Sequence, residues 1–150
     1  MKKRIISLLL AGLLGASVNV YASSDAAETA LEEENTETPA SDLLVVYFTY
    51  AENAELENLD SYNTIFLGFP NWWGDMPMAV YSFLDAYDLS GKTIAPFVTS
   101  GGSGFSSTID EIESLEPEAE IQEGLSISAS QAAESQDIVQ DWLNSLGYLQ

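Results

Sequence analysis

Two adjacent tryptophans, Trp72 and Trp73, stand in a loop bounded by glycine and proline. The loop reads Gly68-Phe69-Pro70-Asn71-Trp72-Trp73-Gly74-Asp75-Met76-Pro77. Indole rings in a loop offer flat apolar faces on which a planar ligand can stack. Packing of one ring beneath the following helix is the alternative, and it fits either tryptophan alone better than the pair. The pair therefore indicates a site for a flat molecule.

A second loop is rich in glycine and serine and reads Thr99-Ser100-Gly101-Gly102-Ser103-Gly104-Phe105-Ser106. Glycines let a backbone approach a ligand closely, and N–H groups leading into a helix suit a carbonyl or an anion. A flexible connector would have the same composition. The loop is not a P-loop, because no Gly-Lys-Ser/Thr follows it. It is not a nucleophile elbow either, because Ser103 lacks a glycine two residues later.

The residue types that are missing narrow the chemistry further. The chain of 150 residues contains no cysteine and no histidine. Disulfides, thiol nucleophiles, thiolate or histidine metal sites and a Ser-His-Asp triad are therefore excluded. Redox or transfer chemistry must come from carboxylates, hydroxyls, aromatic rings or a bound cofactor. Proton supply would fall to water or to a carboxyl group such as Asp75.

The charge balance is strongly acidic, with 24 acids, four bases and a formal net charge of −20. Three of the bases open the chain, and Lys92 is the fourth. A nucleic-acid binder needs lysine and arginine to neutralise phosphates, so that class is excluded. The same charge argues against adhesion to anionic lipid surfaces. We expect a basic protein as partner, if the chain has a protein partner.

The N-terminal segment, residues 1–22, is typical of a secretory signal peptide. Lys2-Lys3-Arg4 precedes a mostly apolar stretch, and Val20-Tyr21-Ala22 provides a cleavage site. A membrane anchor is the alternative, but the apolar run is shorter than the roughly 20 residues that a span needs. Residues 23–41 hold six acids and no base, which predicts a disordered acidic tether. We therefore expect an extracytoplasmic location, with no stable membrane insertion after cleavage.

Residues 42–150 read as one α/β domain. Continuous apolar runs predict strands at 43–48, 64–69, 93–98 and 119–127. Helical spacing predicts three helices between and after them: one capped by Asp75 with Pro77 in its first turn, one capped by Ser106 or Ser107, and one capped by Ser130. This alternation favours a doubly wound parallel sheet, in which ligands bind at the carboxyl ends of the strands. Both loops above follow predicted strands.

The two loops together resemble those of the flavodoxin-like family, notably its secreted and short bacterial members. The matching residues are Gly68, Pro70, Trp72, Trp73, Gly74, Pro77 and Thr99 to Gly104. The resemblance extends from about Leu43 to the C-terminus. It implies a flavodoxin fold with FMN at the strand ends. The residues Pro70, Asn71, Trp72, Trp73 and Gly74 would flank the isoalloxazine ring, and Thr99, Ser100, Gly101, Gly102, Ser103 and Gly104 would offer N–H groups to its pyrimidine edge.

The chain departs from the family pattern after the first predicted strand. The usual phosphate loop contains glycine, whereas here Thr49 and Asn53 are the plausible phosphate partners among Glu52, Glu55 and Glu57. One helix and one strand of the usual fold are missing. The 15 residues from 49 to 63 still suffice for a right-handed crossover. We therefore expect a sheet shortened to about four strands, with its first strand exposed at an edge.

Three functions stay open at this point. The leading one is an FMN-binding electron-transfer domain. The alternative is a degenerate domain that has lost the cofactor and acts as an acidic binding module. The third is an FMN-dependent oxidoreductase that reduces a small quinone-like substrate. Flavin absorbance separates the first from the second, and turnover with a reductant would support the third.

Overall fold

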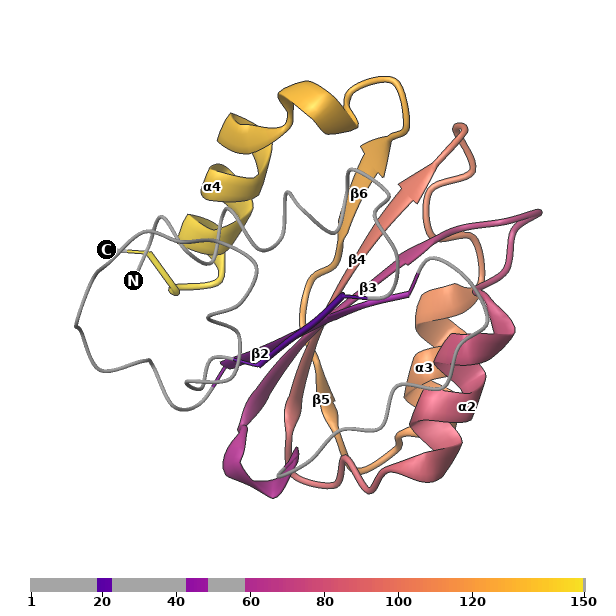
Figure 1. Cartoon of the computed structure of the whole chain (residues 1–150), viewed down its shortest axis with the longest axis vertical. Coiled ribbons are helices and arrows are strands. Elements are labelled where there is room, and N and C mark those ends of the chain that lie inside the picture. The colour runs from indigo at the N-terminus through magenta and orange to yellow at the C-terminus, as the bar shows by residue number, and fades with distance from the viewer. Residues whose placement is uncertain (1–18, 23–42, 49–58, 150) are drawn as a thin grey trace.

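The computed structural model describes residues 43–48 and 59–149 and the backbone of residues 19–22 (Figure 1). The elements in chain order are β1 (Asn19–Ala22), β2 (Leu43–Tyr47), the 3-10 turn η2 (Leu59–Ser61), β3 (Thr64–Pro70), α2 (Met78–Ala86), β4 (Thr93–Ser100), α3 (Thr108–Leu115), β5 (Glu120–Ile121), β6 (Leu125–Ser128), the 3-10 turn η3 (Ala132–Glu134) and α4 (Gln136–Ser145). The predicted tether at 23–41 lies outside the described residues. Within the described part, no helix is long and apolar enough to cross a membrane.

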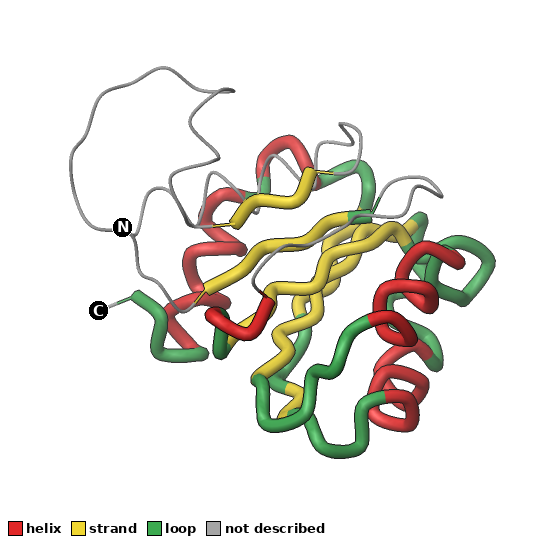
Figure 2. Tube along the Cα trace, turned by 60° about the horizontal axis from the view of Figure 1, so that its bottom comes forward, coloured by secondary structure: helices red, strands yellow, loops and turns green. Residues whose placement is uncertain are grey.

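The strands form one sheet in the order β1-β2-β3-β4-β5, with β6 also paired to β4. The pairs β2·β3, β3·β4, β4·β5 and β4·β6 are all parallel. Helices cover both faces of this sheet: α2 and α3 lie on one side and α4 on the other (Figures 1 and 2). The predicted α/β architecture with a short parallel sheet is confirmed.

The fourth predicted strand, 119–127, exists but is interrupted between β5 and β6. Ile94 of β4 accepts a backbone hydrogen bond from Gln122 at 2.9 Å, so Ile94 and every second residue after it face this neighbour. Pro96 is the next such residue, and proline has no N–H to donate. Gly124 lies beside it, and a Cβ there would sit 2.5 Å from the Phe105 ring. The ladder therefore breaks at Pro96 and resumes at Leu125, which pairs with Phe97.

The outer edge of β2 is occupied rather than open. β1 pairs antiparallel with β2, from Asn19 opposite Tyr47 to Ala22 opposite Leu44. The expectation that the first strand of the parallel sheet would be an exposed edge is therefore wrong for the full chain. Unpaired N–H and C=O groups on an apolar edge attract any available strand, which explains the pairing. The strand β1 falls inside the predicted signal peptide, which stays a prediction.

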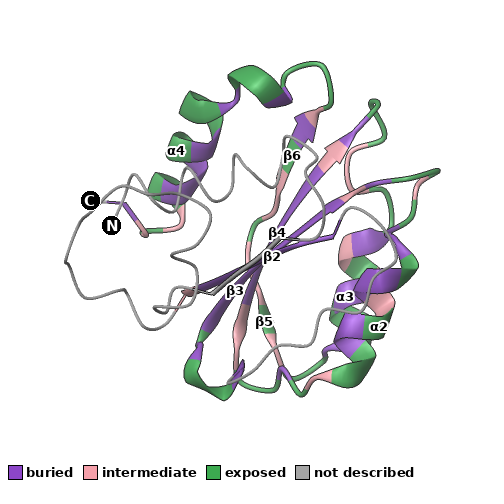
Figure 3. Ribbon diagram, viewed as in Figure 1, coloured by how far each residue is buried: buried purple, intermediate pink, exposed green. Residues whose placement is uncertain are grey.

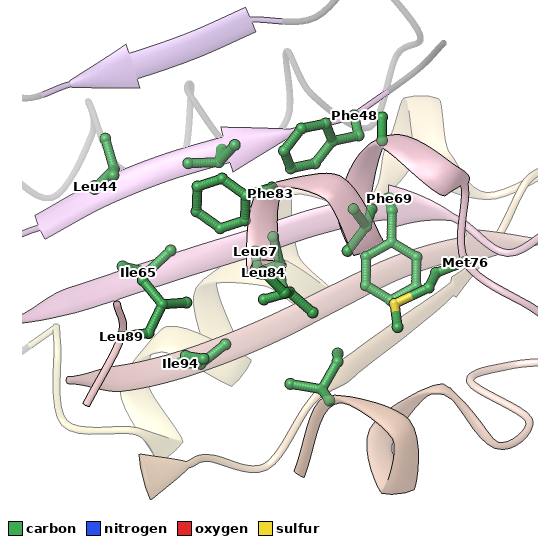
Figure 4. Close-up of a cluster of buried hydrophobic side chains, with 14 of the residues drawn as sticks. Leu44, Phe48, Ile65, Leu67, Phe69, Met76, Phe83, Leu84, Leu89 and Ile94 are labelled. Atoms are coloured by element: carbon green, nitrogen blue, oxygen red, sulfur yellow. The ribbon is translucent and has the colours of Figure 1, made fainter. Parts of the chain in front are cut away.

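Each face of the sheet carries its own hydrophobic core, and the central strands are buried along almost their whole length (Figure 3). Beneath α2 and α3, Phe83 of α2 packs on Phe48 with ring centroids 5.5 Å apart (Figure 4). On the other face, Trp142 of α4 packs edge-on against Phe66 at 5.8 Å. The continuous apolar runs of the sequence follow from this arrangement, because alternate residues of one strand supply both cores.

Two helix starts differ from the predictions. Helix α2 begins at Met78 after Pro77, and Asp75 is not its cap, because the backbone of Asp75 is held in a hairpin with Trp72. Helix α4 begins at Gln136 after Ser135 rather than near Ser130. The hydroxyl of Ser130 bonds to that of Ser128 at 2.7 Å, and η3 separates it from the helix. Helix α3, by contrast, starts after Ser107 as expected.

Candidate functional site

The predicted site stands on an aromatic floor at the carboxyl end of the sheet. The rings of Tyr47 on β2 and Phe97 on β4 stack at 5.7 Å across the intervening strand β3. The residue of β3 between them is Gly68, where a Cβ would lie 2.2 Å from the Phe97 ring and 2.3 Å from the Tyr47 ring. Gly68, the first residue of the tryptophan motif, is therefore needed for the packing of these two rings.

The tryptophan loop is a tight hairpin. Trp72 donates its backbone N–H to the Asp75 carbonyl at 2.9 Å, and Asp75 donates back to Trp72 at 3.1 Å. The two residues at the tip, Trp73 and Gly74, have φ angles of 59° and 89°. A turn with positive φ at both central residues suits glycine, and a tryptophan there is strained. The hairpin therefore holds the Trp73 backbone in a conformation that local sterics disfavour.

Both indole rings of this hairpin reach solvent. Trp73 is fully exposed and Trp72 is 43% exposed. Packing beneath the following helix, the alternative considered for these rings, is therefore wrong for Trp73. A fully exposed indole is costly to hydrate, so its place at the tip of a strained turn favours a role in contact with another molecule.

Two backbone N–H groups of the second loop form hydrogen bonds within the loop itself. The hydroxyl oxygen of Ser100, a buried side chain, accepts from the N–H of Gly104 at 3.0 Å and from that of Gly102 at 3.3 Å. The N–H groups of Gly101 and Ser103 have no such bond to the described residues. Open space surrounds Gly101 and Gly102. Of the N–H groups predicted to meet a ligand, these two are the ones left to do so.

Asn71 joins the two loops. Its backbone N–H donates to the Thr99 carbonyl at 2.8 Å, and its side-chain Nδ2 donates to the Gly104 carbonyl at 2.7 Å. Its Oδ1 is buried and has no partner among the described residues. A buried amide oxygen without a donor costs about 1–3 kcal/mol. The sequence predicts Asn71 as a residue flanking the ligand, and in the structure this side chain holds the two loops together.

The other predicted residues fall at or beyond the same edge. Pro70 ends β3 and is paired with Thr99 on β4. Thr49, the predicted phosphate contact, lies outside the described residues, as do Asn53 and the three glutamates around it.

Two tyrosines at this end were not singled out from the sequence. The Tyr47 hydroxyl lies 3.2 Å from Oγ1 of Thr99, and burial raises the pKa of Tyr47 while this hydrogen bond lowers it. The Tyr81 hydroxyl on α2 contacts the carboxylates of both Asp75 and Glu111. Only the position of Tyr47 at the end of a buried strand could have signalled it. Among the described residues, no group of three or more acids lies together in a way that could hold a metal ion.

Comparison with known proteins adds the family. The flavodoxin family model matches residues 48–146. The fold is similar to a "putative flavoprotein" of Bacteroides eggerthii, with a TM-score of 0.55 and 27% identity over 63% of this chain and 57% of that one. It is also similar to a protein of the same description from Bacteroides uniformis, with a TM-score of 0.54 and 32% identity over 61% of this chain and 56% of that one. No curated protein matches.

The chain thus spans a little over half the length of these two solved proteins. The matched residues include β3, β4, α2, α3 and all of α4, together with both loops of the candidate site. On the extent of this match, the chain belongs to the flavodoxin family.

Proposed function

We propose that the chain binds FMN at the carboxyl ends of β3 and β4 and serves as an extracytoplasmic electron-transfer domain. One observation carries the proposal: Asn71 bonds the exposed tryptophan hairpin to the glycine loop, through Nδ2 and the Gly104 carbonyl at 2.7 Å. Flat apolar surface and backbone donors thereby come together at the strand ends, where α/β sheets bind their ligands. The two solved relatives, each a "putative flavoprotein", support a flavin as that ligand.

The residues at this edge fit the chemical demands of a flavin ring. An isoalloxazine is a flat aromatic system, for which Trp72 and Trp73 offer exposed rings. Its pyrimidine edge carries carbonyl oxygens, for which the N–H groups of Gly101 and Ser103 are available. It also carries one N–H, and the Asn71 Oδ1 is an acceptor without a partner among the residues that the structure describes. Because that oxygen is buried, a ligand would reach it only if the two loops shift apart slightly.

A bound flavin would supply the one- and two-electron chemistry that this chain's own side chains lack. The chain's residues have other tasks. The tryptophan rings cover the ring system and exclude water, while Ser100 keeps the glycine loop in shape through its two accepted bonds. Asp75 is the carboxyl group of the hairpin and can hold a proton at Oδ2, since Oδ1 already accepts from the Met76 N–H at 2.7 Å.

The remaining parts of the proposal rest on charge and on the N-terminal sequence. Residues 59–149 contain 14 acids and Lys92 as their only base. This field favours a basic redox partner and opposes an added negative charge on the flavin. The signal-like residues 1–22 support delivery outside the cytoplasm.

The test is an absorbance and fluorescence titration of the purified full chain with FMN. We expect flavin absorbance bands in the spectrum of the protein. We also expect flavin emission to be quenched on binding, because stacked indole rings quench it. A protein that is colourless and leaves FMN emission unchanged at high protein concentration would overturn the proposal. It would favour the alternative, an acidic binding module without a cofactor.

A further inference from the structure

The outer edge of β2 is covered by a strand that belongs to the predicted signal peptide. β1 pairs antiparallel with β2, and Tyr21 lies opposite Val45. The described core residues on both faces of the sheet, by contrast, all come from residues 43–149. Removal of residues 1–22 would therefore uncover the edge of β2 and leave both of these cores complete.

Alternate residues of β2 direct their backbone groups to this edge. The Phe48 N–H donates to the Gly68 carbonyl of β3 at 2.9 Å, so Phe48 and every second residue before it face β3. The residues between them, Leu43, Val45 and Tyr47, therefore face outward to β1. When β1 leaves, the N–H and C=O groups of these three residues lose the strand that faces them.

The sequence of β2 carries none of the features that usually keep strand edges apart. Residues 43–47 read Leu-Leu-Val-Val-Tyr, with no charge, no proline and no glycine. The preceding residues, 23–41, are a poor replacement for β1, because they hold six acids and Leu31 as their only large apolar residue. A second copy of β2 is the better occupant, since it is apolar and rich in strand-forming residues.

Two copies of β2 also match in register. The edge already accepts an antiparallel strand in this structure. If Val45 lies opposite Val45 of a second copy, Leu43 of each copy meets Tyr47 of the other. All three outward residues then stand in hydrogen-bonded pairs, and each pair exchanges two N–H···O bonds. A shift of two residues would pair only two of the three.

We propose that removal of residues 1–22 opens the β2 edge for self-association, and that two mature chains join there into one continuous sheet. The two-fold axis passes through the Val45 pair, which makes the interface the same patch on both copies. While residues 1–22 remain, β1 covers the edge and keeps the chain monomeric. The proposal rests on the exported location in the proposed function, but it does not depend on flavin binding.

The charge of the mature chain gives this dimer a characteristic salt dependence. Without residues 1–22 the chain carries 24 acids and one lysine, a net charge of −23. Two such copies repel each other, whereas the paired strands themselves carry no charge. Because salt screens the repulsion, added salt should strengthen the dimer. A dimer held together by ion pairs would weaken instead.

The test is sedimentation velocity over a series of protein and salt concentrations, without flavin. The full chain should stay monomeric, whereas the chain that begins at Ser23 should form dimers whose fraction rises with both concentrations. In the full chain, Tyr21→Pro removes the N–H opposite Val45 and should also produce dimers. If the shortened chain lost its circular dichroism signal, this full-length variant would decide the question alone.

Proline at the edge separates this interface from any other. The Val45 N–H faces outward, so Val45→Pro leaves the ladder with β3 intact. It removes both hydrogen bonds at the two-fold axis, which should raise the dissociation constant of the dimer at least about tenfold. Val45→Ala is the matched control, because it keeps the N–H. If Val45→Pro does not fold, Leu43→Pro and Leu43→Ala replace the pair at the first residue of the strand.

Cysteine cross-linking tests the register, because the chain has no cysteine of its own. Two copies of Val45→Cys would bring their Cα atoms to about 5.5 Å, within the range of a disulfide. Oxidation should therefore link the shortened chain into covalent dimers. Two copies of Leu43→Cys would lie about 13 Å apart along the strands, so that control should stay unlinked.

Three results would overturn the proposal: a shortened chain that is monomeric at every protein and salt concentration, a dimer that Val45→Pro weakens no more than Val45→Ala, or equal cross-linking at both positions. A full chain that dimerises as well as the shortened one would also overturn it. A monomer would favour a strand of another protein as the occupant of this edge. Failure to bind FMN would overturn the proposed cofactor and leave all of these measurements unaffected.

Discussion

The two loops at the carboxyl edge of the sheet treat their binding groups differently. The tryptophan hairpin exposes its rings at the cost of a left-handed Trp73. The glycine loop does the opposite, because it folds two of its N–H groups inward onto Ser100 and leaves two outward. The hairpin thus exposes apolar rings on a strained backbone, whereas the glycine loop uses two of its donors to fix its own conformation. Asn71 bonds the two loops together, so this edge of the sheet presents both exposed rings and a loop of fixed shape.

We expect the largest effect from a substitution in the aromatic floor beneath both loops, where Tyr47 and Phe97 stack over Gly68. Gly68→Ala would place a methyl group 2.2 Å from the Phe97 ring and 2.3 Å from the Tyr47 ring, and neither buried ring has room to move. We expect the free energy of unfolding to fall by about 3 kcal/mol, at the upper end for overpacking. Urea denaturation measures it.

Gly101→Ala is the matched control, because no atom lies within 4 Å of the added methyl group. Its unfolding free energy should stay within about 0.5 kcal/mol of the wild type. If the two substitutions cost the same, Tyr47 and Phe97 do not pack across β3 as described.

The fixed shape of the glycine loop depends on one oxygen atom. Ser100→Ala leaves the N–H groups of Gly102 and Gly104 without their acceptor beneath a buried side chain. We expect a loss of about 1.5 kcal/mol in unfolding free energy. Any flavin affinity should drop as well, because a mobile loop must be ordered on binding. Ser103→Ala, at an exposed position of the same loop, should change neither quantity, and an equal loss there would count against the role of Ser100.

In the tryptophan hairpin, by contrast, we expect a substitution that raises the free energy of unfolding. Trp73→Gly removes the side chain that disfavours the left-handed conformation, so the free energy of unfolding should rise by about 1 kcal/mol. The same change removes a stacking ring, so flavin affinity should fall about fivefold, or about 1 kcal/mol. Trp72→Ala should lower affinity by a similar factor. If neither change weakens flavin binding, the ring does not lie against this hairpin.

These outcomes also show which parts of the molecule a sequence can predict. The strands β2, β3 and β4 were predicted because they are continuous apolar runs buried on both faces. Both loops were predicted because Trp, Gly and Pro are rare together and follow strands. The break in the fourth predicted strand was not predicted, because the proline that causes it, Pro96, lies in the neighbouring strand β4.

Interactions between distant residues account for what the sequence did not predict. The Ser100 hydroxyl accepts bonds from its own loop, and Tyr81 reaches Glu111 thirty positions away on another helix. Neither contact leaves a periodic or compositional trace. The antiparallel β1 lies beside β2, where the strand order 2-1-3-4-5 of flavodoxin-like folds has its outer strand. The four residues of β1 show no sequence pattern that predicts this pairing.

The phosphate of the ligand should contribute little to affinity, and its contribution distinguishes ring recognition from recognition of the whole cofactor. Phosphate sites normally combine several backbone N–H groups at a helix N-terminus with little opposing charge. Residues 59–149 carry 14 acids, and their one lysine is already bonded to the Tyr62 carbonyl. The predicted phosphate partners, Thr49 and Asn53, stand among three glutamates. The phosphate dianion of FMN should therefore add little binding free energy here, because the groups of both loops are suited to the isoalloxazine ring alone.

We accordingly expect FMN and riboflavin to bind within about tenfold of each other, a difference of at most about 1.4 kcal/mol. Titrations of both flavins at matched ionic strength measure it, and raising the salt should bring the two affinities closer because it screens the acidic field. A preference for FMN of a hundredfold or more would reveal a phosphate site between β2 and β3 that the sequence does not display. Near-equal binding of FMN and riboflavin would instead show that the two loops bind the isoalloxazine ring without help from a phosphate site.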